Sequence, residues 1–155
     1  MLFRQLFDSV SSTYTYLLAD EQTRDAVLLD PVFEQHARDA ALLHELGLRL
    51  RFTLDTHCHA DHVTGAWLMK AVLGSRIALS RSYAAENVDV PLDPGDVIRF
   101  GSEALEVRAT PGHTNGCLSF VTPDRRAVMV FDEESGVVDD PRAAERTAWP
   151  ANHSA

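Results

Sequence analysis

Residues 56–62 read Thr-His-Cys-His-Ala-Asp-His, so four of these seven consecutive side chains can bind a metal ion. In an extended segment the side chains alternate between faces, so His57 and His59 are expected to point to the same side. Asp61 and His62 follow where we expect the chain to turn into a helix, whose free N–H groups favour a carboxylate. Three imidazoles and one carboxylate form a ligand set that suits zinc, iron or manganese.

The segments on either side of this stretch predict a strand–loop–helix unit. An apolar run from Leu48 to Leu54 precedes it, and apolar residues at helical spacing run from about Val63 to Leu73, where Gly74 ends the helix. The alternative is a set of four polar loop residues with no common role. The chain has only seven histidines in 155 residues, so three within six positions beside an aspartate favour a metal site.

Length and composition predict one acidic domain of a cytoplasmic protein. The chain has 155 residues, 45% of them hydrophobic, which is enough for one core. Its formal net charge of -9 argues against binding to nucleic acid or to anionic membranes. Residues 1–8 lack the continuous apolar stretch typical of a signal peptide, and no apolar run approaches the roughly 18 residues that a membrane helix needs. The two cysteines, Cys58 and Cys117, make no disulfide framework, and we expect both to be small buried residues.

The remaining segments predict an α/β layered domain built mostly on sheet. Strands are expected in an antiparallel meander at 2–8, 13–19 and 26–29, followed by a helix over 33–46. Further strands are expected at 76–79, 97–100, 105–109, 118–122 and 127–131, of which the last two form a hairpin. Residues 83–92 show no clear period and are expected to be loop or frayed helix. Residues 132–155 combine alanine, proline and charge, which predicts a disordered tail.

A further histidine, His113, lies in a glycine-rich turn at the end of a predicted strand. Gly112 and Gly116 let the backbone bend sharply there, so the imidazole can point inward. A lone histidine in a turn is more often solvated, but together with His57 it favours a shared site.

Three segments together resemble the metallo-β-lactamase superfamily, and the resemblance runs over about residues 2–131. They are the 56–62 stretch with Thr64-Gly65, the segment Gly95-Asp96-x-Ile98-x-Phe100-Gly101, and the turn Pro111-Gly112-His113-Thr114-x-Gly116-Cys117. The His-x-His-x-Asp-His motif is specific for the superfamily. Cys58, Ala60 and the Gly-His-Thr-x-Gly-Cys turn are more similar to its persulfide dioxygenase branch, with glyoxalase II as the neighbouring branch.

The resemblance implies an αββα sandwich with a metal site at one edge, and residues 1–131 would be its N-terminal half. It implies one Fe(II) held by two histidines and one aspartate, which leave positions for O2 and substrate. The ligands would be His57, His113 and Asp132. His59, Asp61 and His62 would orient these ligands and assist catalysis. The expected partner is glutathione persulfide, which would be oxidised to sulfite and glutathione, and a homodimer is allowed.

Two alternatives stay open at this stage. A hydrolase of glyoxalase II type would use the same histidines and Asp61 around one or two zinc ions, which activate a water against a thioester. Full occupancy of that site needs a later histidine that this sequence lacks. The other alternative is a catalytically inactive, truncated remnant of the family.

The sequence departs from the family pattern after Phe131. The family continues there with Thr-Gly-Asp, whose aspartate is the third ligand, whereas this chain reads Asp132-Glu133-Glu134. Asp132 would serve as the ligand if the register slips by two residues, and Glu134 would serve without a slip. The family's later Gly-Arg-Thr-Asp segment is also missing, so we expect the C-terminal half to be missing or replaced and a sheet edge to be exposed. A frameshift after Phe131 is one explanation, and the nucleotide sequence of the gene tests it.

Overall fold

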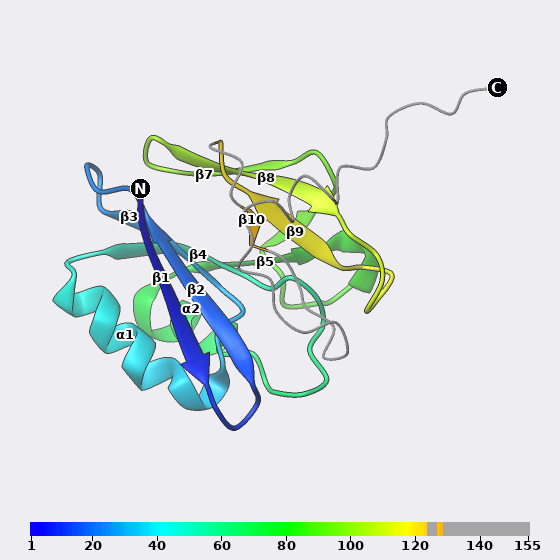
Figure 1. Cartoon of the computed structure of the whole chain (residues 1–155), viewed down its shortest axis with the longest axis horizontal. Coiled ribbons are helices and arrows are strands. Elements are labelled where there is room, and N and C mark those ends of the chain that lie inside the picture. Colours follow the sequence, from blue (N-terminus) through cyan, green and yellow to red (C-terminus); the bar gives the residue numbers. More distant parts are fainter. Residues whose placement is uncertain (124–126, 129–155) are drawn as a thin grey trace.

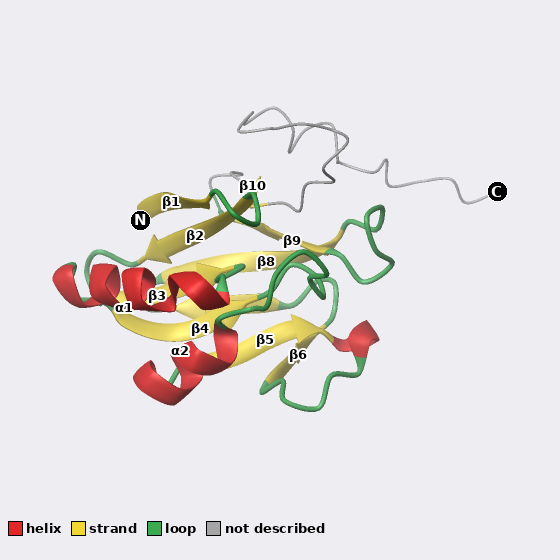
Figure 2. Ribbon diagram, turned by 90° about the horizontal axis from the view of Figure 1, so that it is seen from below, coloured by secondary structure: helices red, strands yellow, loops and turns green. Residues whose placement is uncertain are grey.

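A computed structural model of the chain describes residues 1–123 and 127–128. Two β-sheets stack on each other, and the helices cover the outer face of the larger sheet (Figures 1 and 2). The predicted ligand Asp132, its alternative Glu134 and the predicted tail 132–155 lie outside the described residues. No helix in the described part of the chain is both long enough and apolar enough to cross a membrane.

The larger sheet has six strands in the order β1-β2-β3-β4-β5-β6. The predicted antiparallel meander is confirmed as β1 (Leu2–Asp8), β2 (Thr13–Ala19) and β3 (Asp25–Leu29). The strands that continue the sheet in parallel are β4 (Arg49–Leu54), β5 (Arg76–Ser80) and β6 (Val90–Leu92). A 3₁₀ turn, η1 (Phe33–Gln35), and helix α1 (His36–Glu45) connect β3 to β4, and helix α2 (Ala66–Leu73) connects β4 to β5.

The smaller sheet is antiparallel and has the order β10-β9-β8-β7. Its strands are β7 (Val97–Phe100), β8 (Glu103–Ala109), β9 (Leu118–Val121) and β10 (Ala127–Val128). The predicted hairpin is confirmed where Ala127 and Val128 pair with β9. The turn between β8 and β9 carries His113, so the second sheet delivers this residue to the end of the first.

Two apolar cores bury both faces of the central strands. Leu18, on β2, belongs to the core between the sheets, whereas its neighbour Leu17 belongs to the core under the helices. Leu43 of α1 and Met69 of α2 complete the second core. A strand that is packed on both faces cannot shift its register without exposing apolar side chains. The strand ends that support residues 56–62, called the metal loop from here on, are therefore held firmly.

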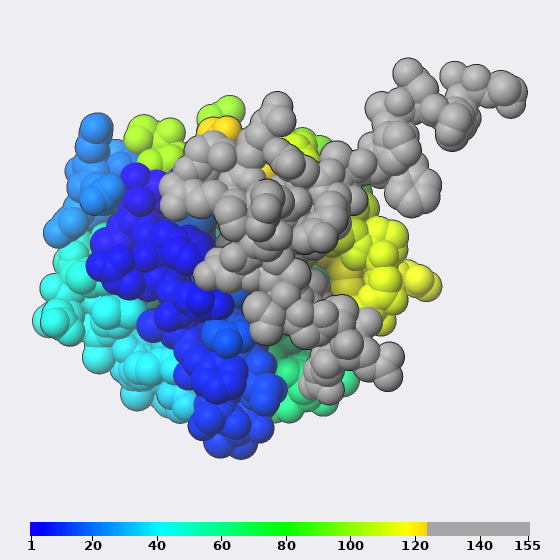
Figure 3. All heavy atoms as spheres, in the orientation of Figure 1, coloured from blue at the N-terminus to red at the C-terminus, as the bar shows by residue number. Residues whose placement is uncertain are grey.

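β1 forms one edge of the larger sheet and is visible in dark blue in Figure 3. Phe7 on this strand packs against Tyr14 on β2, with ring centroids 4.8 Å apart, while half of Phe7 stays exposed. An aromatic cross-strand pair of this kind stabilises the pairing of β1 with β2.

The start of α2 differs from the prediction. The helix begins at Ala66 rather than at Val63, because Thr64 forms a β-bridge with Val32 and its hydroxyl accepts a hydrogen bond from the Ala66 N–H (3.2 Å). The metal-loop residue Asp61 therefore lies a full turn before the helix and not at its N-terminus.

Helix α2 exposes two large apolar side chains, and the segment that follows β5 contains a strand that was not predicted. Trp67 and Val72 are 51% and 65% exposed, and Trp67 stacks on Phe33. Residues 83–92 contain the short strand β6, which follows the 3₁₀ turn η2 (Arg81–Tyr83). A three-residue strand is too short to show a period, which is why the sequence gives no signal for it.

Asp20, just after β2, ties the two sheets together. Its carboxylate accepts hydrogen bonds from the backbone N–H (2.6 Å) and hydroxyl (2.9 Å) of Ser102 in the β7–β8 turn. It also accepts one from the Thr23 hydroxyl (2.9 Å). The backbone N–H groups of Ser102 and Gln22 hold the pKa of Asp20 well below its usual range. Gly101 approaches this group so closely that a Cβ would collide with both Thr23 Oγ1 and the Asp20 carboxylate.

We expect Gly101→Ala to lower the free energy of unfolding by about 2–3 kcal/mol, because it adds a collision to a left-handed backbone strain. Gly74→Ala is the matched control, since its φ of +72° is close to the +65° of Gly101 and nothing lies within 4 Å of the added Cβ. The control is expected to lose only about 1–2 kcal/mol. Urea unfolding measures the free energy of unfolding of both variants. Equal losses would show that the close approach of Gly101 to Asp20 and Thr23 does not matter for stability.

We expect Asp20→Asn to lower the thermal midpoint at pH 7, with a deficit that narrows in acid. The folded-state pKa of Asp20 is depressed, so its contribution is present above the unfolded-state pKa of about 4 and is lost as the pH falls through the folded-state pKa. Thermal unfolding between pH 7 and pH 2.5 measures the difference. A deficit that stays constant over this range would show that the carboxylate charge does not contribute.

Candidate metal centre

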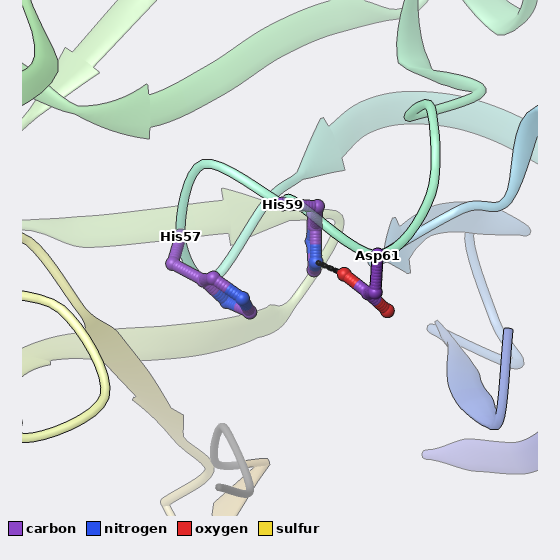
Figure 4. Close-up of side chains that lie close together, drawn as sticks. All are labelled: His57, His59 and Asp61. Atoms are coloured by element: carbon purple, nitrogen blue, oxygen red, sulfur yellow. Dashed lines mark ion pairs between the residues drawn. The ribbon is translucent and has the colours of Figure 1, made fainter. Parts of the chain in front are cut away.

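The predicted metal-binding side chains gather at the carboxyl end of β4. His57, His59 and Asp61 offer ligand atoms that all lie within 4.8 Å of one another (Figure 4). The His57 and His59 rings are 4.0 Å apart between centroids, and the His59 and His62 rings are 4.2 Å apart. His113 arrives from the β8–β9 turn with its ring 4.8 Å from that of His57. The structure thus brings together five of the six predicted site residues, while Asp132 is outside its described part.

Asp30 holds this loop in place, although its only signal in the sequence was as the end of a strand. It follows β3, whose carboxyl end lies beside that of β4 because the two strands are parallel. The Asp30 carboxylate accepts hydrogen bonds from the Thr56 N–H (2.7 Å) and hydroxyl (2.8 Å), and from His59 Nε2–H (3.0 Å).

This one carboxylate determines which nitrogens of two imidazoles are free. The Thr56 hydroxyl donates its only proton to Asp30, so it accepts from His57 Nδ1–H (3.0 Å), and His57 Nε2 keeps its lone pair. His59 uses Nε2–H on Asp30, so its free nitrogen is Nδ1, which lies 3.7 Å from Asp61 Oδ1. A carboxylate that orients a ligating histidine is the usual support of a metal site.

His62 supplies a nitrogen that the described residues leave unsatisfied. Its Nδ1 lies 3.0 Å from Asp61 Oδ2 and 3.3 Å from the Thr13 hydroxyl, which itself donates to Asp61 (3.1 Å). Its Nε2 is buried and has no hydrogen-bond partner within the described part of the chain. A buried polar atom without a partner calls for an explanation, and a metal ion beside this set of imidazole and carboxylate donors is one. The residues present therefore fit a bound metal.

The protonation states near the loop also suit metal binding, which needs neutral imidazole and charged carboxylate. Burial, helped by the nearby His59, lowers the pKa of His57 to about 4, so this ring is neutral at pH 7. Burial alone would raise the pKa of Asp61, but the hydrogen bonds from His62, the backbone and Thr13 together with the charge of His62 outweigh it and lower the pKa to about 2. Burial acts to lower the pKa of His59, but the hydrogen bond to Asp30 and the charges of Asp30, Asp55 and Asp61 together raise it overall, so a metal ion competes with a proton there.

A second group of possible ligands, formed by Asp30, Asp55 and His59, lies just beneath the first. Burial and the charge of Asp30 raise the pKa of Asp55 to about 7. Asp55 accepts a hydrogen bond from the Thr64 hydroxyl (2.9 Å), and Asp30 is saturated by its own donors. We interpret this group as the support of the metal loop, since its oxygens already have partners.

The turn that carries His113 is clamped against the end of β5. The Tyr83 hydroxyl forms a short hydrogen bond with Thr114, whose N–H and hydroxyl lie 3.2 and 3.1 Å from Cys117 Sγ. Gly116 fits closely, because a Cβ there would lie 2.6 Å from the Tyr83 ring. The Leu118 N–H donates to the Thr56 carbonyl (2.9 Å), which joins this turn to the metal loop.

The two cysteines behave differently. Cys117 is buried, as predicted, and accepts the hydrogen bonds of the His113 turn. The prediction that Cys58 is buried is wrong, since its side chain is exposed. It lies between two histidines that occupy the inner side of the loop, which leaves the outer side for the thiol.

Residues 8–132 match the sequence profile of the Metallo-beta-lactamase superfamily, and the chain belongs to that superfamily. The predicted resemblance and fold are thereby confirmed. Among curated relatives, the human protein named Persulfide dioxygenase ETHE1, mitochondrial, is 50% identical over 133 residues, which are 85% of this chain and 52% of that protein. The Hydroxyacylglutathione hydrolase of Gloeobacter violaceus is 34% identical over 123 residues, or 77% of this chain and 48% of that protein.

The solved structures support the same branch. The crystal structure of ETHE1 from Myxococcus xanthus superimposes with a TM-score of 0.77 at 46% sequence identity, and the match covers 80% of this chain and 55% of that chain. The chain spans about half the length of the curated relatives it matches.

We expect Tyr83→Phe to weaken metal binding about tenfold, because it frees the turn that aims His113. Cobalt(II) titration followed by visible absorbance measures the affinity, and circular dichroism checks the fold. In a His113→Ala background the same substitution should have no effect, since the residue that Tyr83 positions is gone. An equal loss in both backgrounds would show that Tyr83 acts only on general stability.

Proposed function

We propose that this chain carries the metal-binding half of a persulfide dioxygenase-type site, a non-haem Fe(II) centre that oxidises glutathione persulfide to sulfite and glutathione. The observation that carries the proposal is the identity over the segment with the metal loop. It is 50% with the human persulfide dioxygenase and 34% with the hydroxyacylglutathione hydrolase. The convergence of His57 and His113 supports it, because these are two of the three ligands that the resemblance implies.

The proposed reaction consumes one persulfide, one O2 and one water, and releases one thiol and one sulfurous acid as sulfite. The two sulfurs of the persulfide together lose four electrons and O2 gains them, so no other oxidant is needed. Bound iron would supply the redox centre at which O2 and the persulfide meet. His57 and His113 would hold it together with an acidic residue, for which Asp132 remains our candidate.

The residues around the ligands have separate proposed tasks. Asp30 fixes the ring of His59 through Nε2 and that of His57 through Thr56. His62 Nδ1 lies 3.0 Å from Asp61 Oδ2, and the charged Asp61 carboxylate lies beside the ligands. A carboxylate placed there would orient the ligands.

A second candidate is a thioester hydrolase with two metal ions. The observation in its favour is that His59 Nδ1, Asp61 and His62 Nε2 offer donor atoms beyond those that one iron needs. Two ions would activate a water against the thioester carbonyl. A catalytically inactive chain is the third candidate, supported by the chain spanning about half of its relatives.

We also propose a cellular compartment for the protein. The cytoplasmic location predicted from composition is retained, although the human relative is named as mitochondrial.

We expect the chain, reconstituted anaerobically with Fe(II), to bind about one iron and then to consume O2 with glutathione persulfide. His57→Ala should lose both the iron and the O2 uptake, because the site loses a ligand. His44→Ala, an exposed histidine on α1, is the matched control and should change neither. Iron is quantified by chelator absorbance and O2 with an electrode.

The same samples separate the candidates. Hydrolysis of a glutathione thioester with zinc, without O2 uptake with iron, would replace the proposal by the hydrolase. Iron binding without either activity would support the inactive chain.

A further inference from the structure

A cavity of about 460 Å³ lies at the end of β4 opposite the metal loop. Its size falls in the range of small-molecule sites. It is lined by the first residues of β4 and β5 and by the end of α2. Arg49 and Leu54, at the two ends of β4, are five residues or roughly 17 Å apart at about 3.3 Å per residue, and Asp55 and Thr56 separate Leu54 from His57. The cavity is therefore a site of its own.

Three arginines, Arg49, Arg51 and Arg76, line this cavity. Arg51 lies at a β-bulge, because Leu50 pairs with Ala26 and the next pair is Phe52 with Val27. The extra residue of a bulge is unpaired and its side chain is re-aimed. Arg51 is exposed at this bulge and is one of the residues that line the cavity.

The three guanidinium groups differ in their carboxylate neighbours: among the described residues Arg51 has none, and the charge of Arg76 contributes to lowering the pKa of Asp89 without an ion pair. Arg49 is ion-paired with Asp25 at 3.0 Å. Arg76 lies over the ring of Phe52, 5.5 Å from its centroid, and Arg51 forms no ion pair in the part of the chain that the structure describes. Such a gathering of positive charge is unexpected in a chain with a net charge of -9. An oxyanion between the guanidinium groups would relieve their repulsion and accept charge-assisted hydrogen bonds.

The rest of the lining is apolar. Leu48, Leu50, Phe52 and Leu73 share the cavity with the arginines. A bare inorganic anion would leave this surface in contact with water, whereas an organic anion would cover it. We propose that the cavity binds a small organic molecule with a phosphate or similar oxyanion group, held by Arg51 and Arg76 and with its apolar body against Phe52 and the leucines.

Isothermal titration at constant ionic strength tests the proposal, with phenyl phosphate, inorganic phosphate and phenol as probes. Phenyl phosphate should bind saturably at one site, inorganic phosphate should bind more weakly and phenol should not bind. The double variant Arg51→Gln/Arg76→Gln should weaken phenyl phosphate at least tenfold. Arg99→Gln, which removes an exposed arginine on β7, is the matched control and should bind as the wild type does.

Three results would overturn the proposal. The first is a lack of saturable binding by the wild-type chain. The second is equal weakening by the double variant and the Arg99→Gln control, which would indicate attraction by net charge alone. The third is loss of binding in a His57→Ala chain, which would place the phosphate at the metal loop instead. Retained binding in that chain supports the separate site, whatever the outcome for the proposed dioxygenase activity.

Discussion

The candidate metal centre depends on one buried carboxylate, that of Asp30. It receives the backbone N–H and hydroxyl of Thr56 and the Nε2–H of His59. Through these contacts it leaves His57 with a free Nε2 and His59 with a free Nδ1. A flexible loop with the same residues would have to order several side chains on binding a metal, at a cost in conformational entropy. Here the loop is ordered by the protein itself, so its donor atoms already converge.

The packing of the sheets explains why Asp30 can do this. β3 and β4 run in parallel, so the ends of both strands meet at one edge, and apolar cores on both faces hold their register. The smaller sheet packs on the same strands and brings His113 to that edge through the clamped β8–β9 turn. Asp20 joins the two sheets at the end of β2 that lies away from the metal loop. Ligand geometry is thus a consequence of strand register rather than of the loop sequence alone.

The sequence alone predicted the metal loop, the order of the helices and of the strands other than β6, and the partnership of His57 with His113, because these depend on local pattern and on a specific motif. The sequence did not predict the role of Asp30, because that role arises from the pairing of β3 and β4, which a helix separates in the chain. The start of α2 was misplaced because the Thr64–Val32 bridge is a tertiary contact that overrides helical periodicity. Cys58 was misjudged because alternation says which residues share a face and not which face is buried.

The most direct test of this account is the cobalt(II) affinity of Asp30→Asn, measured by absorbance on the folded chain. An amide offers one acceptor oxygen in place of a carboxylate with several acceptor sites, so it cannot hold Thr56 and His59 together. The account predicts an affinity about 10- to 100-fold weaker than that of the wild type. Asp20→Asn, which neutralises a carboxylate far from the loop, should bind cobalt as the wild type does. An Asp30→Asn chain that binds cobalt as tightly as the wild type would contradict the account.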